Sequence, residues 1–468
     1  MQQRTLIQGG RVLTMVPGDD AAVRDILVEG DRIVAIGPRI DVGDAQVIDA
    51  SDCIVHPGFV DTHRHTWQTQ LRTVATDWSL FDYVVEMRCI FSMFYQAEDA
   101  YLGNYVGALE ALNAGITTVV DHCHIINSPD HAHEAARGLM DSGIRAHFCY
   151  GFWPNPTSLT PFTLTPGEPW RFEAAKALRK GLLSSDTGRV SFGIAPSELE
   201  GMPFDLSRSE IQFAREMAAS RISLHVAVGA YDAGERMVTR LSDAGLLGND
   251  MLFVHGAALT DAELKLLADS GAGLSVTPET ELQMGMGIPV AARALAAGVQ
   301  TSIGVDIVSN YAGDMFAQMR LLLQTMRSQQ NLDYERAGKA PRVIRPRASE
   351  VLRLATVDAA RVTGLQGAQG MLQIGDKADI VLTRTTSIHM TPATDPVGAL
   401  VLNANASDVD TVLVDGRIVK RGGQLVGVDW AALSKRLRAS SERILEQAAT
   451  VDAAPIRNFV SDMFKNIA

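Results

Sequence analysis

The residues with the clearest chemical meaning are two histidines separated by one residue, His63 and His65, in the segment HPGFVDTHRH. Side chains two positions apart on a strand point to the same side, so both imidazoles can reach one ion. His225 ends the apolar run RISLH, and Asp306 ends TSIGVD. Three imidazole nitrogens and one carboxylate suit a borderline divalent ion, Zn²⁺ first and Fe, Mn or Co as alternatives, with a position left for water. We therefore predict that these four residues hold one divalent metal ion.

Eight short runs of apolar β-formers, each followed by a helix-like stretch, would position these residues. A βα unit repeated eight times closes into a barrel, whose chemistry sits at the C-terminal ends of its strands. His255, at the end of MLFVH, falls at such an end as well. The expected strands are centred on GFVDTHRH, ITTVVDHCH, IRAHFCYG, RVSFGIAP, RISLHVA, MLFVHGAA, GLSVTPE and VQTSIGVD. The predicted fold class is α/β, a (β/α)8 TIM-like barrel.

Both ends of the chain carry strand and turn patterns of one style, including a hairpin at Val414-Asp415-Gly416-Arg417. We expect residues 1–56 and 376–428 to form one composite β-sandwich domain, residues 57–375 the barrel, and residues 429–468 a helical tail. Apolar residues at helical spacing predict an amphipathic helix from about Ala453 onward. Its apolar face would cover either its own barrel or an oligomer interface.

The bulk composition narrows the class of protein. The chain has 468 residues, of which 46% are hydrophobic and 21% charged, as in soluble globular proteins. A net charge of −12 disfavours nucleic acid and anionic membranes as partners. No secretory signal or stretch of 18 apolar residues is visible, which predicts a cytoplasmic protein. Four cysteines without a C-x-x-C pair indicate reduced thiols. A small-molecule substrate and a homo-oligomer, by default a dimer, are expected.

The chain resembles the amidohydrolase superfamily, within it the cytosine deaminase and atrazine chlorohydrolase-like (ATZ/TRZ) branch. The likeness covers nearly the whole length, from PGFVDTHRH to the barrel-exit motif that begins at Ala355-Thr356 and continues as GMLQIGDKADIV at residues 370–381. It implies that His63, His65 and His225 are ligands, and that Asp306 is both ligand and proton carrier. His255 would then polarise the substrate or stabilise a developing anion. Binuclear relatives carry a bridging lysine after strand four, where this chain reads RVSFGIAPSE, so one metal is expected.

One position departs from this family pattern. Many deaminases and triazine hydrolases of the branch carry a glutamate three residues after the fifth-strand histidine, where this chain has Val228. An apolar side chain cannot act as a general acid, which puts the usual ring-deaminase mechanism in doubt. Glu198, Glu200, Glu279 or Glu281 could replace it, although each is also an ordinary loop or helix-start carboxylate.

Four further residues are candidate substrate contacts. Gln68 follows the first histidine pair, and His122 and His124 form a second pair that either contacts substrate or is hydrogen-bonded structure. A second metal there would lack nearby carboxylates. Glu281 lies in the expected substrate loop after strand seven, where relatives often have Ser-Asn at the positions of Thr280-Glu281.

The leading functional hypothesis is hydrolysis of a C–N bond in a small organic molecule by a metal-bound hydroxide, at an amide, urea, carbamate or amidine-like carbon. The alternative is displacement of halide or thiolate from an activated carbon, as in a chlorohydrolase. A catalytically inactive scaffold of the same fold is disfavoured, because all expected ligands are present.

Overall fold

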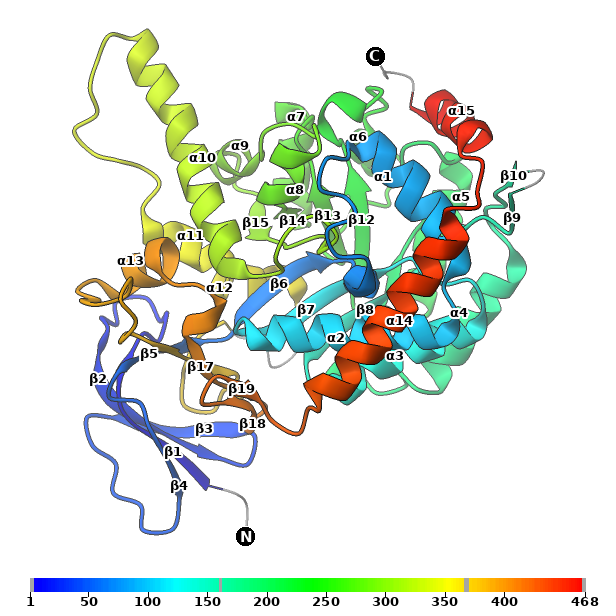
Figure 1. Cartoon of the computed structure of the whole chain (residues 1–468). Coiled ribbons are helices and arrows are strands. Elements are labelled where there is room, and N and C mark those ends of the chain that lie inside the picture. The colour runs from blue at the N-terminus through cyan, green and yellow to red at the C-terminus, as the bar shows by residue number, and fades with distance from the viewer. Residues whose placement is uncertain (1–3, 160–161, 366–369, 465–468) are drawn as a thin grey trace.

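The computed structural model describes residues 4–159, 162–365 and 370–464, and its centre is a barrel of eight parallel strands (Figure 1). All eight predicted strands are present, and they are hydrogen-bonded in the order in which they occur along the chain. They are β6 (Phe59–Arg64), β7 (Ile116–Cys123), β8 (Arg145–Gly151), β11 (Val190–Ala195), β12 (Ile222–Val226), β13 (Met251–His255), β14 (Gly273–Val276) and β15 (Gln300–Ile303). The predicted (β/α)8 fold class is therefore confirmed.

The barrel closes where β15 meets β6, at the predicted site residues themselves. The backbone N–H of Asp306 donates to the carbonyl of His63 at 2.8 Å, and that of His65 donates to the carbonyl of Asp306 at 2.7 Å. These two bonds fix the last strand against the first, so the carboxylate and the histidine pair share one edge.

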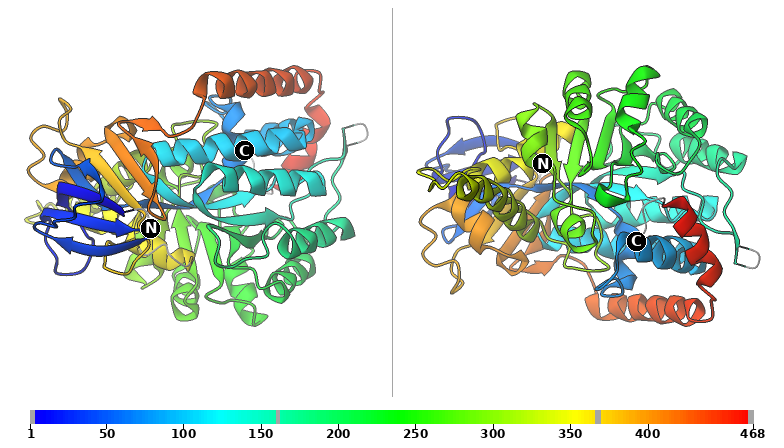
Figure 2. Two further views of the ribbon diagram at one scale, coloured as in Figure 1. Left: turned by 90° about the horizontal axis from the view of Figure 1, so that it is seen from below. Right: turned by 90° about the horizontal axis from the view of Figure 1, so that it is seen from above.

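Helices lie around the outside of the barrel, in the segments that connect its strands (Figure 2). Before β7 the chain forms η1 (Thr66–Leu71), α1 (Leu80–Tyr83), η2 (Val84–Ile90), η3 (Phe91–Phe94) and α2 (Ala97–Asn113). Between β7 and β15 lie α3 (Pro129–Ser142), the short strands β9 (Ser158–Leu159) and β10 (Phe162–Thr163), α4 (Pro169–Lys180), α5 (Phe204–Glu216), η4 (Gly229–Tyr231), α6 (Met237–Asp243), α7 (Asp261–Ser270), α8 (Pro278–Gln283) and α9 (Ala291–Ala296). After β15 follow α10 (Met315–Arg336), α11 (Ala348–Leu354) and α12 (Val357–Thr363).

The two chain ends form a second sheet, as the sequence predicts. β5 pairs antiparallel with β16, which joins the N-terminal and C-terminal strands into one nine-stranded sheet with its own apolar core. Its strands are β1 (Arg4–Val12), β2 (Ala22–Glu29), β3 (Arg32–Gly37), β4 (Gln46–Asp49), β5 (Cys53–Pro57), β16 (Ile380–Arg384), β17 (Val409–Val414), β18 (Arg417–Arg421) and β19 (Gln424–Leu425). Short helical turns α13 (Pro396–Gly398), η5 (Ala399–Asn403) and η6 (Ala406–Asp408) connect β16 to β17.

A buried charge cluster ties this sheet to the barrel. Arg145, at the start of β8, donates to both carboxylate oxygens of Asp379 at 2.9 and 3.1 Å and also pairs with Asp415. Asp415 and Gly416 both have positive φ angles, as the central residues of the predicted hairpin require. The hairpin thus presents Asp415 to the barrel.

The tail forms α14 (Trp430–Ala448) and α15 (Ala454–Met463), and α15 is the predicted amphipathic helix. Ile456 and Val460 are fully buried against the protein's own barrel domain, whereas Phe459 is 39% exposed. The four cysteines are buried and unpaired. Among the described residues, no helix is long and apolar enough to cross a membrane. The predicted homo-oligomer stays a prediction.

Candidate metal centre and active site

The structure brings the four predicted ligands together at the C-terminal ends of β6, β12 and β15. The Nε2 atom of His63 lies 3.2 Å from Nε2 of His225 and 3.3 Å from Oδ1 of Asp306. The same carboxylate oxygen lies 3.4 Å from Nε2 of His65. Ligand atoms held at about 2.0–2.1 Å around a tetrahedral zinc ion are themselves about 3.3 Å apart. The spacing of these donor atoms therefore fits a small divalent ion.

Hydrogen bonds on the far side of two imidazoles leave the correct nitrogens free for a metal. Nδ1 of His65 lies 2.8 Å from the backbone carbonyl of His122, and Nδ1 of His225 lies 2.9 Å from Oε2 of Glu198. Each Nδ1 must carry the proton in such a bond, so the lone pair of each ring is on Nε2.

The protonation states also suit ligands. Burial lowers the pKa of His63 to about 4, although Asp306 partly opposes this, and burial lowers the pKa of His65 still further. Neutral imidazoles are the form that binds metal. Burial would raise the pKa of Asp306, but hydrogen bonding and charge interactions with His63, His255 and His65 outweigh it and lower that pKa. The carboxylate is therefore ionised at neutral pH.

His255 lies beside this group, at the end of β13. Its ring centroid is 5.9 Å from that of His63, and its Nδ1 is 3.0 Å from Oγ1 of Thr277 and 3.5 Å from Oε1 of Glu281. Burial opposes protonation, yet the hydrogen bond to Glu281 and the charge of Asp306 raise the pKa of His255. The opposite edge of the ring is left to contact a ligand.

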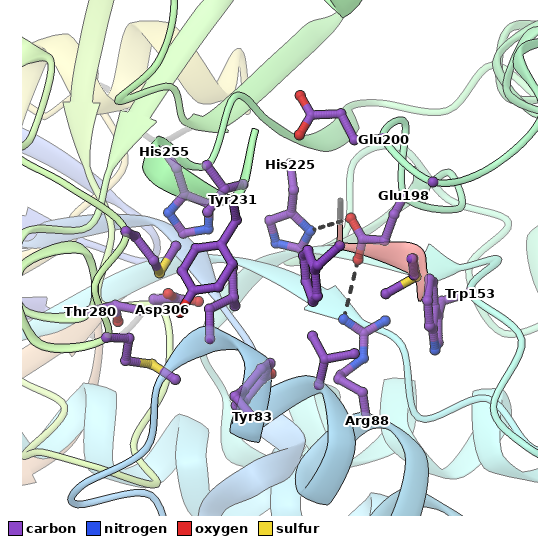
Figure 3. A pocket seen from close by; sticks show the side chains of 18 of the residues that line it. Tyr83, Arg88, Trp153, Glu198, Glu200, His225, Tyr231, His255, Thr280 and Asp306 are labelled. Carbon is purple, nitrogen blue, oxygen red and sulfur yellow. Dashed lines mark hydrogen bonds and ion pairs between the residues drawn. The ribbon is translucent and has the colours of Figure 1, made fainter. Parts of the chain in front are cut away.

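A chain of three side chains supports His225. Glu198 binds Nδ1 of His225 through one oxygen and accepts from Nη1 of Arg88 at 3.2 Å through the other (Figure 3). Arg88 is 4% exposed and lies 4.7 Å from the ring of Trp153. Burial would raise the pKa of Glu198, but His225 and Arg88 lower it, so the carboxylate stays charged. Arg88 was not among the residues predicted from the sequence, and it lies in the segment between β6 and β7, far along the chain from His225.

Removing the charge of Glu198 should therefore weaken metal binding. We expect Glu198→Gln to lower metal affinity by about 10–100-fold, because the amide binds the His225 N–H more weakly and cannot balance Arg88. Competition with a chromophoric chelator measures the effect. Glu173→Gln, at an exposed glutamate on α4, is the control, and equal affinities of the two variants would contradict the supporting role.

The four predicted substrate contacts are all buried, and none lies on the wall of the cavity above the donor atoms. Gln68 donates to the Tyr83 hydroxyl at 2.6 Å and accepts from Ser309. His122 bonds Ser223, His124 accepts from the indole of Trp67, and Glu281 accepts from the backbone of Thr277. Each positions a neighbouring group, so direct contact with substrate stays a prediction for these four residues.

The cavity is lined mostly by apolar and aromatic side chains over a polar floor. His65, His225, His255 and Asp306 lie on the lining. The apolar lining consists of Leu80, Val84, Trp153, Val228, Ala233, Met284, Met286, Ile307, Met463 and Phe464, with Tyr83 and Tyr231 beside them. Two of these residues, Met463 and Phe464, come from the C-terminal tail. The amphipathic pattern predicted the helix but not its place at the cavity.

The four glutamates considered as replacements at Val228 differ sharply in position. Val228 lines the cavity, as does Glu200, whereas Glu198 is tied to His225 and Arg88. Glu279 bonds both amide atoms of Gln318 through its own backbone N–H and carboxylate, and it is not part of the lining. Glu281 lies behind His255.

Comparison with known proteins agrees with this geometry. The model of the amidohydrolase family matches residues 54–419. The chain is 28% identical over 453 residues, 95% of this chain and 99% of the relative, to a 5-methylthioadenosine/S-adenosylhomocysteine deaminase of Desulforudis audaxviator. It is 29% identical to the enzyme of that name from Thermococcus onnurineus, over 88% of this chain and 93% of the relative.

Solved structures share the fold. A zinc-bound adenosine deaminase from Xanthomonas campestris superposes with a TM-score of 0.81 at 24% identity, covering 94% of this chain and 98% of the other. The zinc complex of atrazine chlorohydrolase from Arthrobacter aurescens TC1 superposes with a TM-score of 0.76 at 20% identity, covering 93% of this chain and 100% of the other.

Because the family model spans most of its length, the chain belongs to the amidohydrolase family. It is an enzyme that hydrolyses carbon–nitrogen bonds other than peptide bonds.

Proposed function

We propose that this protein is a mononuclear zinc hydrolase that deaminates the amidine-like carbon of an aminated nitrogen heterocycle. The observation that carries the proposal is the position of Asp306, whose Oδ1 contacts Nε2 of both His63 and His65 on the floor of a cavity. The curated relatives that span nearly the whole chain are named as deaminases of adenine-containing compounds. The chain has no lysine after β11 to bridge a second ion.

His63, His65, His225 and Asp306 would hold the ion, which when bound activates a water molecule and polarises the substrate. Asp306 is ionised and lines the cavity, so it accepts the proton of the attacking water and passes it to the departing nitrogen. His255 is held by Thr277 and Glu281, and it stabilises the negative charge that develops on the oxygen at the reacting carbon. The apolar walls exclude bulk water from this chemistry.

A panel of candidate substrates tests this proposal. Adenosine, 5′-methylthioadenosine, S-adenosylhomocysteine and atrazine would be incubated with protein of measured metal content, and ammonia, amine and chloride quantified. We expect stoichiometric ammonia from at least one purine nucleoside, and one equivalent of zinc. Chloride without ammonia would favour the displacement reaction instead, and absence of bound divalent metal would overturn the mechanism.

The tail should determine selectivity for a substrate with an apolar arm. Met463 and Phe464 line the cavity, the ring of Phe464 lies 5.4 Å from that of Tyr231, and Arg457 anchors α15 to Asp82 and Glu86.

We expect Phe464→Ala to lower kcat/KM for 5′-methylthioadenosine by about tenfold or more, since loss of one large apolar contact is worth 1–3 kcal/mol. Adenosine, which lacks the methylthio arm, should be affected less. Phe459→Ala is the matched control, because Phe459 packs on Phe162 rather than on the cavity. Equal losses for both compounds would contradict the role.

A further inference from the structure

Cleavage of a C–N bond in an amidine-like group needs a proton donor as well as a base. When water adds to the carbon, the electron pair of the C=N bond moves to nitrogen, which must be protonated as the charge develops. Asp306 takes a proton from the attacking water, so it cannot supply this one at the same moment. A second acid on the cavity wall is needed, and this requirement rests on the proposed function.

The carboxyl groups on the lining are those of Glu198, Glu200, Glu235 and Asp306. Glu198 forms hydrogen bonds with His225 and Arg88 through its two oxygens. Glu235 forms an ion pair with Arg240 at 3.3 Å. Glu200 differs from these, because no arginine, lysine or histidine pairs with it among the described residues of the chain. It is the lining carboxyl that is best placed to hold and release a proton.

The position of Glu200 is fixed by one backbone contact. Its Oε1 accepts from the N–H of Ala227 at 2.7 Å, in the loop just beyond β12. Ala227 is two residues past His225, so the carboxyl is bonded to the backbone just beyond a predicted ligand. Figure 3 shows Glu200 among the lining side chains, on the side of the cavity where His225 and Glu198 also lie. Because Glu200 also lines the cavity, its carboxyl borders the space that a substrate at the predicted metal site would occupy.

We propose that Glu200, from the loop after β11, is the catalytic acid that donates its proton to the substrate nitrogen whose C=N bond is broken by the addition of water. The water oxygen forms the new C–O bond, and its first proton goes to Asp306. Asp306 then passes this proton to the amino nitrogen, the C–N bond breaks, and ammonia leaves. The hydroxyl proton lost on formation of the new C=O bond returns to Glu200 through solvent. The overall change is water consumed and ammonia released.

The surroundings of Glu200 raise its pKa into the neutral range. Burial raises its pKa most, the hydrogen bond from Ala227 opposes this, and the acidic groups of Asp232, Glu198 and Glu235 add to the rise, giving a pKa of about 7. The acid form is therefore present below pH 7 and is lost as the pH rises above it. The rate of the proton-donating step should fall over that same range.

The first measurement does not depend on turnover. Infrared difference spectra of the metal-loaded protein, wild type minus Glu200→Gln, should show a protonated carboxyl band that disappears with a midpoint near pH 7. The control is Glu279→Gln, because burial also raises the pKa of Glu279 to about 7 although that residue lies off the cavity lining. A Glu200 that is already ionised at pH 5 would overturn the proposal, whatever the substrate is.

The second measurement is the pH profile of kcat on a substrate from the panel. Glu200→Gln should lower kcat by about 10²–10⁴-fold, leave metal content unchanged, and remove the fall in rate above pH 7, while Glu279→Gln keeps that fall. Ammonia release by the wild type with equal kcat in Glu200→Gln would overturn the role of Glu200 and leave the proposed function standing. No ammonia from any compound of the panel, with zinc bound, would overturn both.

Discussion

Replacement of Asp306 by asparagine is expected to lower kcat by about 10²–10⁴-fold on any substrate that the wild type turns over. The side chain keeps its size and one oxygen donor, but the amide cannot accept the proton of the attacking water. Burial would raise the pKa of Asp306, but interactions with the histidines at the site, the hydrogen bond with His63 first, hold it below its usual value, so the wild-type carboxylate is ready as a base throughout the neutral range.

Metal content has to be measured beside the rate, because the same residue is a predicted ligand. Steady-state assays at saturating zinc, with bound metal determined by mass spectrometry, separate loss of the base from loss of the ion. Asp333→Asn changes an exposed aspartate near the end of α10 and serves as the control. An undiminished kcat in metal-loaded Asp306→Asn would contradict the assignment of the base.

The strands and the residues at their ends could be read from the sequence because both depend on local patterns. Each strand is a short run of apolar β-formers, and barrel geometry collects the polar residues that end such runs around one axis. His63, His225 and Asp306 are 162 and 81 residues apart along the chain, yet the donor atoms of His63 lie within 3.3 Å of both others.

The residues around the predicted ligands could not be predicted from such local patterns. Arg88, Glu198 and Glu200 lie in segments whose course is set by packing rather than by periodicity. The sequence made Glu198 and Glu200 two of four candidate acids, but no local pattern assigned their roles, and none separated Arg88 from a surface charge. Phe464 follows a helix that the sequence does predict, but the direction of that helix across the barrel mouth depends on contacts far apart in the chain, such as that of Arg457 with Asp82.

The strained backbone conformation of two site residues could not be predicted from the sequence either. His255 and Asp306 have φ angles of 73° and 72°, a conformation that non-glycine residues rarely adopt and that costs of order 1–3 kcal/mol. At Asp306 the two hydrogen bonds that close the barrel hold the backbone in this state. His255 is the last residue of β13 and Asp306 follows the end of β15, and both side chains lie on the cavity lining beside the donor atoms.

Because His255 lies on the cavity lining beside the donor atoms, its replacement should also cause a large fall in kcat. We expect His255→Asn to lower kcat by about 10²–10³-fold at saturating metal, because loss of a preorganised donor to a developing negative charge has that magnitude. Thr277 and Glu281 hold the imidazole through Nδ1, so the shorter amide cannot reach the same point from the same backbone. Rates and zinc content measured together distinguish a catalytic partner from a ligand.

His133→Asn, at an exposed histidine on α3, is the control for replacement of an imidazole away from the cavity. Glu281→Gln supplies an internal comparison, since it leaves the His255 ring in place and changes only the group that orients it. We expect a smaller fall in kcat for that variant than for His255→Asn. If His255→Asn instead loses its zinc while Glu281→Gln retains both zinc and full rate, His255 is a metal ligand and the stabilisation of the developing anion must come from another residue.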